Sequence, residues 1–117
     1  MGKRVLVVDD SSMMRKMITK TLTDGGHTVI GDAKNGLEAV ALYKSLKPDV
    51  VTMDITMREM DGFAAAREIL AHDANARIIF LSNLEEDKYR QEVEKIGARA
   101  FVSKHAAEKI LTVIETL

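Results

Sequence analysis

The segments "RVLVVDDSS" (residues 4–12) and "PDVVTMDITMREMDG" (residues 48–62) follow one pattern, in which a short apolar run ends at acidic residues. In the first segment four apolar residues precede Asp9 and Asp10, and in the second a similar run ends at Asp54. Short apolar runs that are rich in β-branched residues predict buried β-strands. The two segments therefore predict two strands that each carry carboxylates at their carboxyl ends.

Five predicted strands alternate with five predicted helices. The strands are expected at residues 4–8, 27–33, 48–54, 76–82 and 98–103. Between them, apolar residues recur at helical spacing, which predicts amphipathic helices. Their apolar faces are expected on Met14, Ile18 and Leu22; on Leu37, Val40 and Ala41; on Phe63, Ala66, Ile69 and Leu70; on Tyr89, Val93 and Ile96; and on Ala107, Ile110, Leu111 and Ile114. Strands that alternate with helices imply parallel pairing, so we expect an α/β domain with a doubly wound, five-stranded parallel sheet.

Composition narrows the classes of function. The chain has 117 residues, enough for one domain spanning residues 1–117. Its net charge is −1, so no basic excess exists to hold a nucleic acid backbone. It has no cysteine, which excludes disulfides and thiolate chemistry. No apolar run approaches the roughly 20 residues of a membrane helix, so we expect a soluble cytoplasmic protein without membrane insertion.

The strand-end acids predict a metal site. In an open parallel sheet, ligands bind beyond the carboxyl ends of the strands, where the strand order reverses. If the order is 2-1-3-4-5, the first and third strands are neighbours, and Asp9, Asp10 and Asp54 converge there. Crowded carboxylates raise each other's pKa unless a cation sits among them. Oxygen ligands without His or Cys suit Mg²⁺, or Mn²⁺ in its place, and one of the acids is a candidate phosphoryl acceptor.

Two further polar residues end strands at the same edge. Ser82 ends the fourth predicted strand and Lys104 follows the fifth. A lysine ammonium binds phosphate as a compact point charge. An aspartate at a strand end is often only a turn residue, so each residue alone is a weak signal. Together they predict a site for a transient aspartyl phosphate, in which catalysis comes from positioning and charge neutralisation.

With these residues, "MDG" at 60–62 and Phe101, the whole chain resembles the receiver domain of two-component response regulators, most closely the single-domain CheY-like proteins. The resemblance implies a flavodoxin-like (βα)5 receiver fold with strand order 2-1-3-4-5. It implies that Asp54 accepts a phosphoryl group from a histidine kinase. It also implies that Asp9, Asp10 and Asp54, with the backbone carbonyl of Thr56, hold Mg²⁺.

The resemblance further implies a switch. Ser82 and Lys104 bind the phosphoryl oxygens, and movement of Ser82 couples to the ring of Phe101. The coupled movement changes the surface formed by the fourth helix, the fifth strand and the fifth helix, where a downstream protein binds. On this view the chain is a monomer or a weak phosphorylation-dependent dimer.

The chain departs from the usual receiver pattern at three positions. Arg58 and His105 stand where receivers usually have proline, and Asn83 stands where they usually have alanine. We expect these changes to leave the site intact and to alter its kinetics. A cis bond before a non-proline residue costs about 2.5–4 kcal/mol, so we expect a trans bond between Lys104 and His105.

Alternative functions belong to different classes. The chain is expected to be a stand-alone, chemotaxis-type regulator that is no enzyme beyond self-phosphorylation and autodephosphorylation. A second reading is a receiver excised from a longer regulator, such as a transcription factor. A third is a Mg²⁺-dependent phosphohydrolase with an aspartate nucleophile, although the sequence offers no long loop to hold a substrate. A fourth, an interaction module that is not phosphorylated, is disfavoured by the intact acids.

Overall fold

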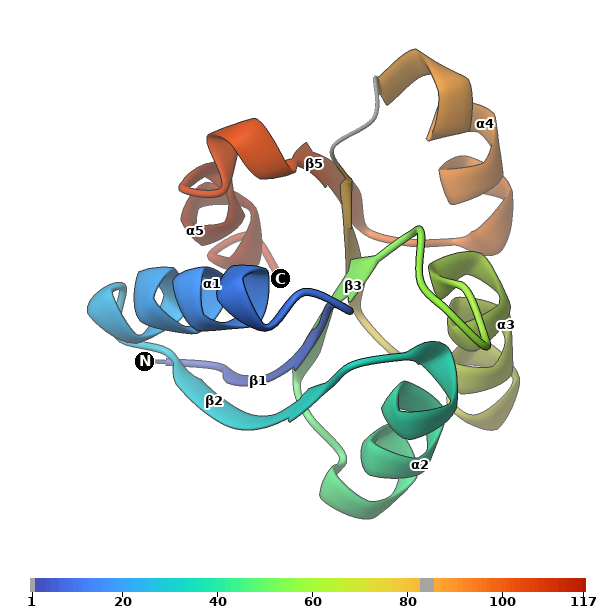
Figure 1. Cartoon of the computed structure of the whole chain (residues 1–117), viewed down its shortest axis with the longest axis horizontal. Helices are drawn as coiled ribbons and strands as arrows, with labels where there is room; N and C mark the ends of the chain where they lie inside the picture. Colours follow the sequence, from blue (N-terminus) through green and yellow to red (C-terminus); the bar gives the residue numbers. More distant parts are fainter. Residues whose placement is uncertain (1, 83–85) are drawn as a thin grey trace.

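The computed structural model describes residues 2–82 and 86–117, without the side chains of residues 86–90 and 105. Within these residues, strands and α-helices alternate along the chain (Figure 1). The elements are β1 (Arg4–Val8), α1 (Ser12–Asp24), β2 (Thr28–Ala33), α2 (Gly36–Leu46), β3 (Val50–Asp54), α3 (Gly62–His72), β4 (Ile78–Ser82), α4 (Glu86–Ile96), β5 (Ala100–Ser103), a 3₁₀ turn (Lys104–Ala106) and α5 (Lys109–Ile114).

The five strands form one parallel sheet in the order β2-β1-β3-β4-β5. The strand order reverses between β1 and β3, where Val8 pairs with Met53. The predicted fold class and strand order are therefore confirmed. Because all strands are parallel, their carboxyl ends meet at one edge of the sheet.

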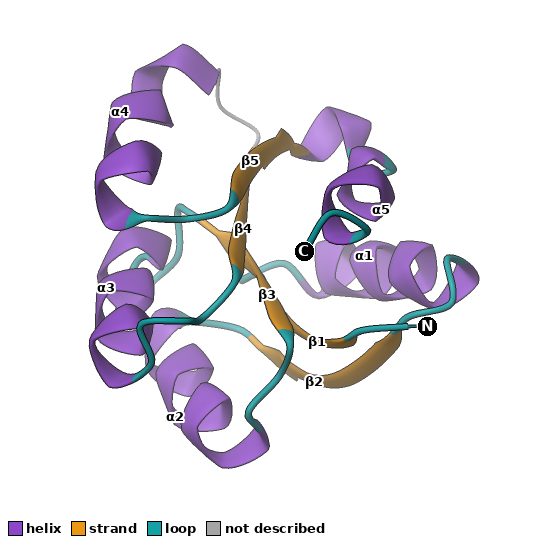
Figure 2. Ribbon diagram, turned by 180° about the vertical axis from the view of Figure 1, so that it is seen from behind, coloured by secondary structure: helices purple, strands orange, loops and turns teal. Residues whose placement is uncertain are grey.

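Helices cover both faces of the sheet. Helices α1 and α5 lie on one face, and α2, α3 and α4 lie on the other (Figures 1 and 2). Successive strand residues point to opposite faces, so Val7 packs under α1 and α5 while Val8 packs under the other three helices. Every residue of β3 and β4 is buried. Central strands covered on both faces leave only their ends accessible to a ligand.

Three helices begin at residues whose side-chain oxygen accepts a hydrogen bond from the N–H three positions further on. This arrangement is an N-cap, and it satisfies a backbone donor that the helix itself leaves without a partner. The capping residues are Ser11 for α1, Asn35 for α2 and Asp61 for α3. Each cap follows a strand through a short loop, so the starts of these helices are fixed at the carboxyl edge of the sheet.

The predicted apolar face of α2 is wrong in part. Leu37 is 53% exposed and Ala41 is also exposed, whereas Ala39, Val40 and Tyr43 are buried. The buried face of α2 is therefore the one that carries Tyr43, and the spacing of the aliphatic residues alone does not identify it. The Tyr43 ring packs in the core, and its hydroxyl donates a hydrogen bond of 2.8 Å to Asp73 Oδ2.

The fifth helix also begins later than its apolar pattern predicts. The pattern starts at Ala107, but residues 104–106 form a 3₁₀ turn and α5 begins at Lys109. Ala107, Ile110 and Ile114 are buried as predicted. Lys104 directly follows β5 as the first residue of this turn, so it lies at the carboxyl edge of the sheet.

Candidate functional site

Three carboxylates converge where the strand order reverses. Asp9 and Asp10 follow β1, and Asp54 is the last residue of β3. One carboxylate oxygen from each lies within 4.8 Å of the others. Asp9 and Asp54 are buried, whereas Asp10 is exposed. This donor set of oxygens, open on the Asp10 side, fits a hard divalent cation such as Mg²⁺ that keeps some of its water.

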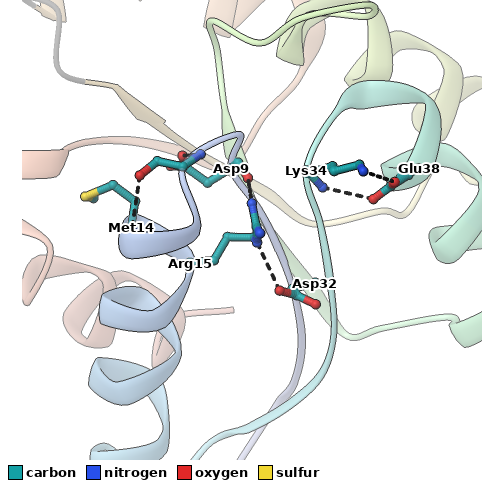
Figure 3. A network of polar contacts seen from close by, with 7 residues as sticks. Asp9, Met14, Arg15, Asp32, Lys34 and Glu38 are labelled. Atoms are coloured by element: carbon teal, nitrogen blue, oxygen red, sulfur yellow. Dashed lines mark hydrogen bonds and ion pairs between the residues drawn. The ribbon is translucent and has the colours of Figure 1, made fainter.

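The loop after β1 is fixed by its own polar groups. The N–H of Ser11 donates to Asp9 Oδ1 at 2.9 Å, and Ser11 then caps α1. Arg15 from the first turns of α1 donates from Nη1 to the Asp9 carbonyl at 2.7 Å and from Nε to Asp32 Oδ2 at 3.0 Å (Figure 3). Arg15 therefore ties the loop that carries two of the acids to the end of β2.

The loop after β3 returns closely past Asp54. The N–H of Gly62 donates to the Ile55 carbonyl at 2.8 Å. A β-carbon on Gly62 would lie 2.1 Å from the Asp54 carbonyl oxygen. Only glycine fits this approach, which explains the glycine of the "MDG" motif and closes the loop between β3 and α3.

Lys104 reaches into the acid cluster. Its Nζ lies 2.6 Å from Asp9 Oδ2 and 3.2 Å from Asp54 Oδ1, and only 6% of its side chain is exposed. Among the described residues it is the cation that touches these two acids. The structure therefore brings Lys104 and the acids together at one edge of the sheet.

One ammonium does not neutralise the cluster. Burial, and then the charge of Asp9, raises the pKa of the Asp54 carboxyl to about 6, although Lys104 opposes the change. Burial alone would lower the pKa of the Lys104 ammonium, but its hydrogen bond with Asp9 and the charges of Asp54 and Asp9 together raise that pKa. The site therefore favours the charged form of Lys104. The ionised form of Asp54 is disfavoured, so a further cation would stabilise it.

The remaining predicted residues lie at the same edge or next to it. Ser82 is buried at the end of β4, and Thr56 is exposed in the loop after Asp54. Phe101 is half-buried in β5 and pairs with Phe80 of β4. Because Ser82 lies two residues after Phe80, it shares the sheet face of both rings.

Two of the residues that differ from the usual receiver pattern are not described, or not described in full, by the structure. The structure does not describe Asn83, and it omits the side chain of His105. The described residues contain no cis peptide bond. The expected trans bond between Lys104 and His105 stays a prediction, because His105 is not described in full.

Sequence reasoning missed Arg15. Its only signal is a position four residues after the capping serine, and a basic residue on an exposed helix turn is common. Its role depends on Asp32, which lies 17 residues away, so it becomes visible only in the folded chain.

The fold and the acid cluster define a response regulator receiver domain. The family profile of this domain matches residues 5–115, and the chain belongs to this family. The chemotaxis protein CheY of Thermotoga maritima is 51% identical over 104 residues, which cover 89% of this chain and 87% of that protein. CheY of Bacillus subtilis is 44% identical over 115 residues, which cover 97% of this chain and 96% of that protein.

A solved structure agrees with this assignment. A chain of the CheX–CheY–BeF3–Mg²⁺ complex from Borrelia burgdorferi superposes with a TM-score of 0.91 at 36% identity, covering 97% of this chain and 87% of that one. The chain thus closely matches CheY proteins over nearly their full length. The matches favour a stand-alone regulator over an excised receiver or a phosphohydrolase. None of the described helices combines the length and the apolar character that a membrane span requires.

Proposed function

We propose that this protein is a phosphorylation-driven switch that accepts a phosphoryl group on Asp54 from a histidine kinase. The observation that supports this most strongly is the ion pairing of Lys104 with both Asp9 and Asp54 inside a cluster of three carboxylates. The Lys104 ammonium lies 3.2 Å from Asp54 Oδ1, so it is close enough to contact a phosphoryl group bound to that carboxylate.

Each residue has a distinct chemical task in this proposal. An Asp54 carboxylate oxygen forms a bond to phosphorus while the bond from phosphorus to the imidazole nitrogen of the kinase's phosphohistidine breaks, and the imidazole leaves with that electron pair. The Asp54 pKa of about 6 leaves the carboxylate mostly ionised at neutral pH. Lys104 and the Ser82 hydroxyl bind the phosphoryl oxygens. Asp9, Asp10 and Asp54, with the Thr56 carbonyl, hold Mg²⁺. When bound, Mg²⁺ neutralises charge on the transferring group.

The same proposal includes an output through β5. Phosphorylation draws Ser82 toward Asp54, and the space it leaves is filled by the ring of Phe101. The position of Phe101 on the Ser82 face of the sheet supports this coupling. The change is a shift between two populated states rather than a new fold.

The changed surface consists of α4, β5 and α5, and a downstream protein binds there. The presence of CheX beside CheY in the Borrelia burgdorferi complex supports a protein target. In this proposal the chain works in the cytoplasm as a monomer or a weak phosphorylation-dependent dimer.

Phosphoryl acceptance is tested by intact-mass spectrometry after incubation with acetyl phosphate, with and without Mg²⁺. The wild type should gain one phosphoryl group only with Mg²⁺ or Mn²⁺, and Asp54→Asn should gain none. Asp73→Asn is the matched control, because Asp73 caps the C-terminal end of α3, opposite to the end of this helix that starts at the carboxyl edge of the sheet, and this variant should be labelled like the wild type. Equal labelling of wild type and Asp54→Asn would contradict the assignment.

The switch is tested by the NMR signals of the Phe101 ring, recorded with and without beryllofluoride. A mimic bound at Asp54 should move these signals toward a more buried environment. An unchanged ring, with Asp54 fully occupied, would mean that the signal leaves the site by another route.

A further inference from the structure

A pocket of about 540 Å³ lies next to the acid cluster. Its lining residues come from the loops after β1, β2 and β3. They are Asp10, Ser11, Lys34, Asn35, Arg58 and Glu59. Because Asp10 belongs both to this pocket and to the acid cluster, the two spaces share a wall.

The backbone holds Arg58 at this pocket. The carbonyl of Met60 accepts a hydrogen bond of 3.0 Å from the N–H of Gly36, the first residue of α2. Glu59 has a φ of 68°, a left-handed conformation that is uncommon outside glycine and turns the chain sharply. The loop that bears Arg58 is therefore pinned against the start of α2, so the guanidinium starts from a fixed backbone position.

The charges of the pocket leave room for an anion. Among the described residues, the Arg58 guanidinium makes no hydrogen bond or ion pair. Within the part of the chain that the structure describes, the Lys34 ammonium makes one long contact, of 3.9 Å, with Glu38. Once Asp10 serves a divalent cation, Glu59 is the one remaining acid in the lining, against the two cations Lys34 and Arg58.

We propose that this pocket binds the carboxylate leaving group of small acyl phosphates, and that Arg58 makes the contact. The inference rests on the proposed function of Asp54. An Asp54 carboxylate oxygen forms a bond to phosphorus while the bond from phosphorus to the acyl oxygen breaks. The carboxylate leaves with the electron pair of that bond and is received by the Arg58 guanidinium.

The physical basis is the shape of the guanidinium. Its planar set of donors matches the two oxygens of a carboxylate, which a lysine or a proline at this position cannot do. Negative charge develops on the leaving oxygen during transfer, so a contact there stabilises the transition state more than the bound donor. A donor with a neutral leaving group, such as phosphoramidate, which releases ammonia, gains less from Arg58. Arg58 is therefore a specificity-determining residue for the choice of phosphodonor.

The first test is the ratio of the second-order labelling rates of Asp54 with acetyl phosphate and with phosphoramidate. Arg58→Gln should lower this ratio about two- to five-fold, as expected for one partly exposed charge-assisted contact. Arg58→Lys should give an intermediate ratio. Arg99→Gln is the matched control, because Arg99 is exposed at the amino end of β5, and it should leave the ratio unchanged. A ratio that is unchanged in Arg58→Gln, or equally lowered in Arg99→Gln, would overturn the proposal.

A second test reads binding without phosphoryl transfer. The Nε–H signal of Arg58, assigned through Arg58→Gln, is followed by NMR while acetate or neutral acetamide is added in the presence of Mg²⁺. Acetate should move this signal, and acetamide should move it less. Equal responses to both compounds, or no response to acetate, would contradict carboxylate binding by Arg58, even if Asp54 is labelled. If no donor labels Asp54, the proposed function is wrong. The acetate titration still shows whether Arg58 binds a carboxylate.

Discussion

Two carboxylates of this protein, Asp54 and Asp73, have pKa values that are shifted in opposite directions. Asp73 caps the end of α3, accepts a 2.8 Å hydrogen bond from the Tyr43 hydroxyl and a 3.0 Å bond from the Asn75 N–H. The Tyr43 hydroxyl is the largest cause that lowers the pKa of Asp73. Asp54 is buried beside Asp9, and its pKa is raised to about 6.

The difference separates a structural charge from a functional one. The chain supplies donors for the charge of Asp73, so ionisation there favours the folded state. For Asp54 and Asp9, the one cation in contact among the described residues is the shared Lys104 ammonium, and the exposed Asp10 adds further negative charge. The cluster is therefore strained until a cation arrives, as expected where a site is built for function rather than stability.

The largest expected effect is a pH dependence that belongs to Asp54. Its folded pKa of about 6 lies above the ordinary value of 3.8, so the folded state holds the proton more tightly than the unfolded state. Without metal, the Asp54 contribution to stability is greatest below pH ~4 and is lost as the pH rises through ~6. The stability of wild type relative to Asp54→Asn should therefore fall by about 2 kcal/mol between pH 4 and pH 7.

Urea unfolding of both proteins across this pH range, in the presence of a chelator, measures that difference. Asp73→Asn is the control, since the lowered pKa of Asp73 gives a dependence of opposite sign. A wild type that stays equally stable relative to Asp54→Asn at both pH values would show that Asp54 is not strained.

The second effect concerns the shared ammonium. Lys104→Met leaves Asp9 and Asp54 buried without a cation, so it should lower the unfolding free energy at pH 7 without metal by about 2 kcal/mol. Lys20→Met is the control, because the Lys20–Asp24 pair is exposed and an exposed ion pair contributes little to stability. Equal losses in the two variants, measured by denaturant unfolding, would contradict the role given to Lys104.

The third effect tests the structural carboxylate. Tyr43→Phe removes the hydroxyl that donates to Asp73 and should lower the unfolding free energy by about 1 kcal/mol. A double-mutant cycle with Asp73→Asn measures the pair, and the two losses should not add. Fully additive losses would mean that the hydrogen bond contributes nothing to stability.

The smallest effect concerns Asp10, which is exposed and adds only a minor repulsion to Asp54. Asp10→Ala should weaken Mg²⁺ binding, and without metal it should leave the melting temperature unchanged or slightly higher. Thermal melts in chelator and a Mg²⁺ titration measure the two quantities. A clearly lower melting temperature in chelator would show that Asp10 is structural.

The acid cluster can be predicted from the sequence more readily than the hydrogen bond between Tyr43 and Asp73. Asp54 ends a strand, and Asp9 and Lys104 each directly follow one. Because parallel strands bring their carboxyl ends together, the convergence of these residues follows from the strand order. Tyr43 and Asp73 lie 30 residues apart on different elements, and their contact depends on how α2 and α3 pack. The sequence predicts Leu37 in the core, whereas the structure leaves it exposed, because the buried side of α2 also depends on how this helix packs. The sequence marks Arg58 only as a departure from the usual proline. Its place in a pocket is visible only in the fold, because three separate loops form that pocket.

The central claim is that the Asp54 cluster gives up stability in order to hold a cation. The most direct measurement is the unfolding free energy of wild type and Asp54→Asn at pH 7, in chelator and in saturating Mg²⁺. In chelator, Asp54→Asn should be the more stable protein. At Mg²⁺ concentrations 100 times the dissociation constant, wild type should gain about 2.7 kcal/mol and Asp54→Asn much less, so the gap should close or reverse. An equal gain in both proteins, or a wild type that is already the more stable in chelator, would contradict the claim.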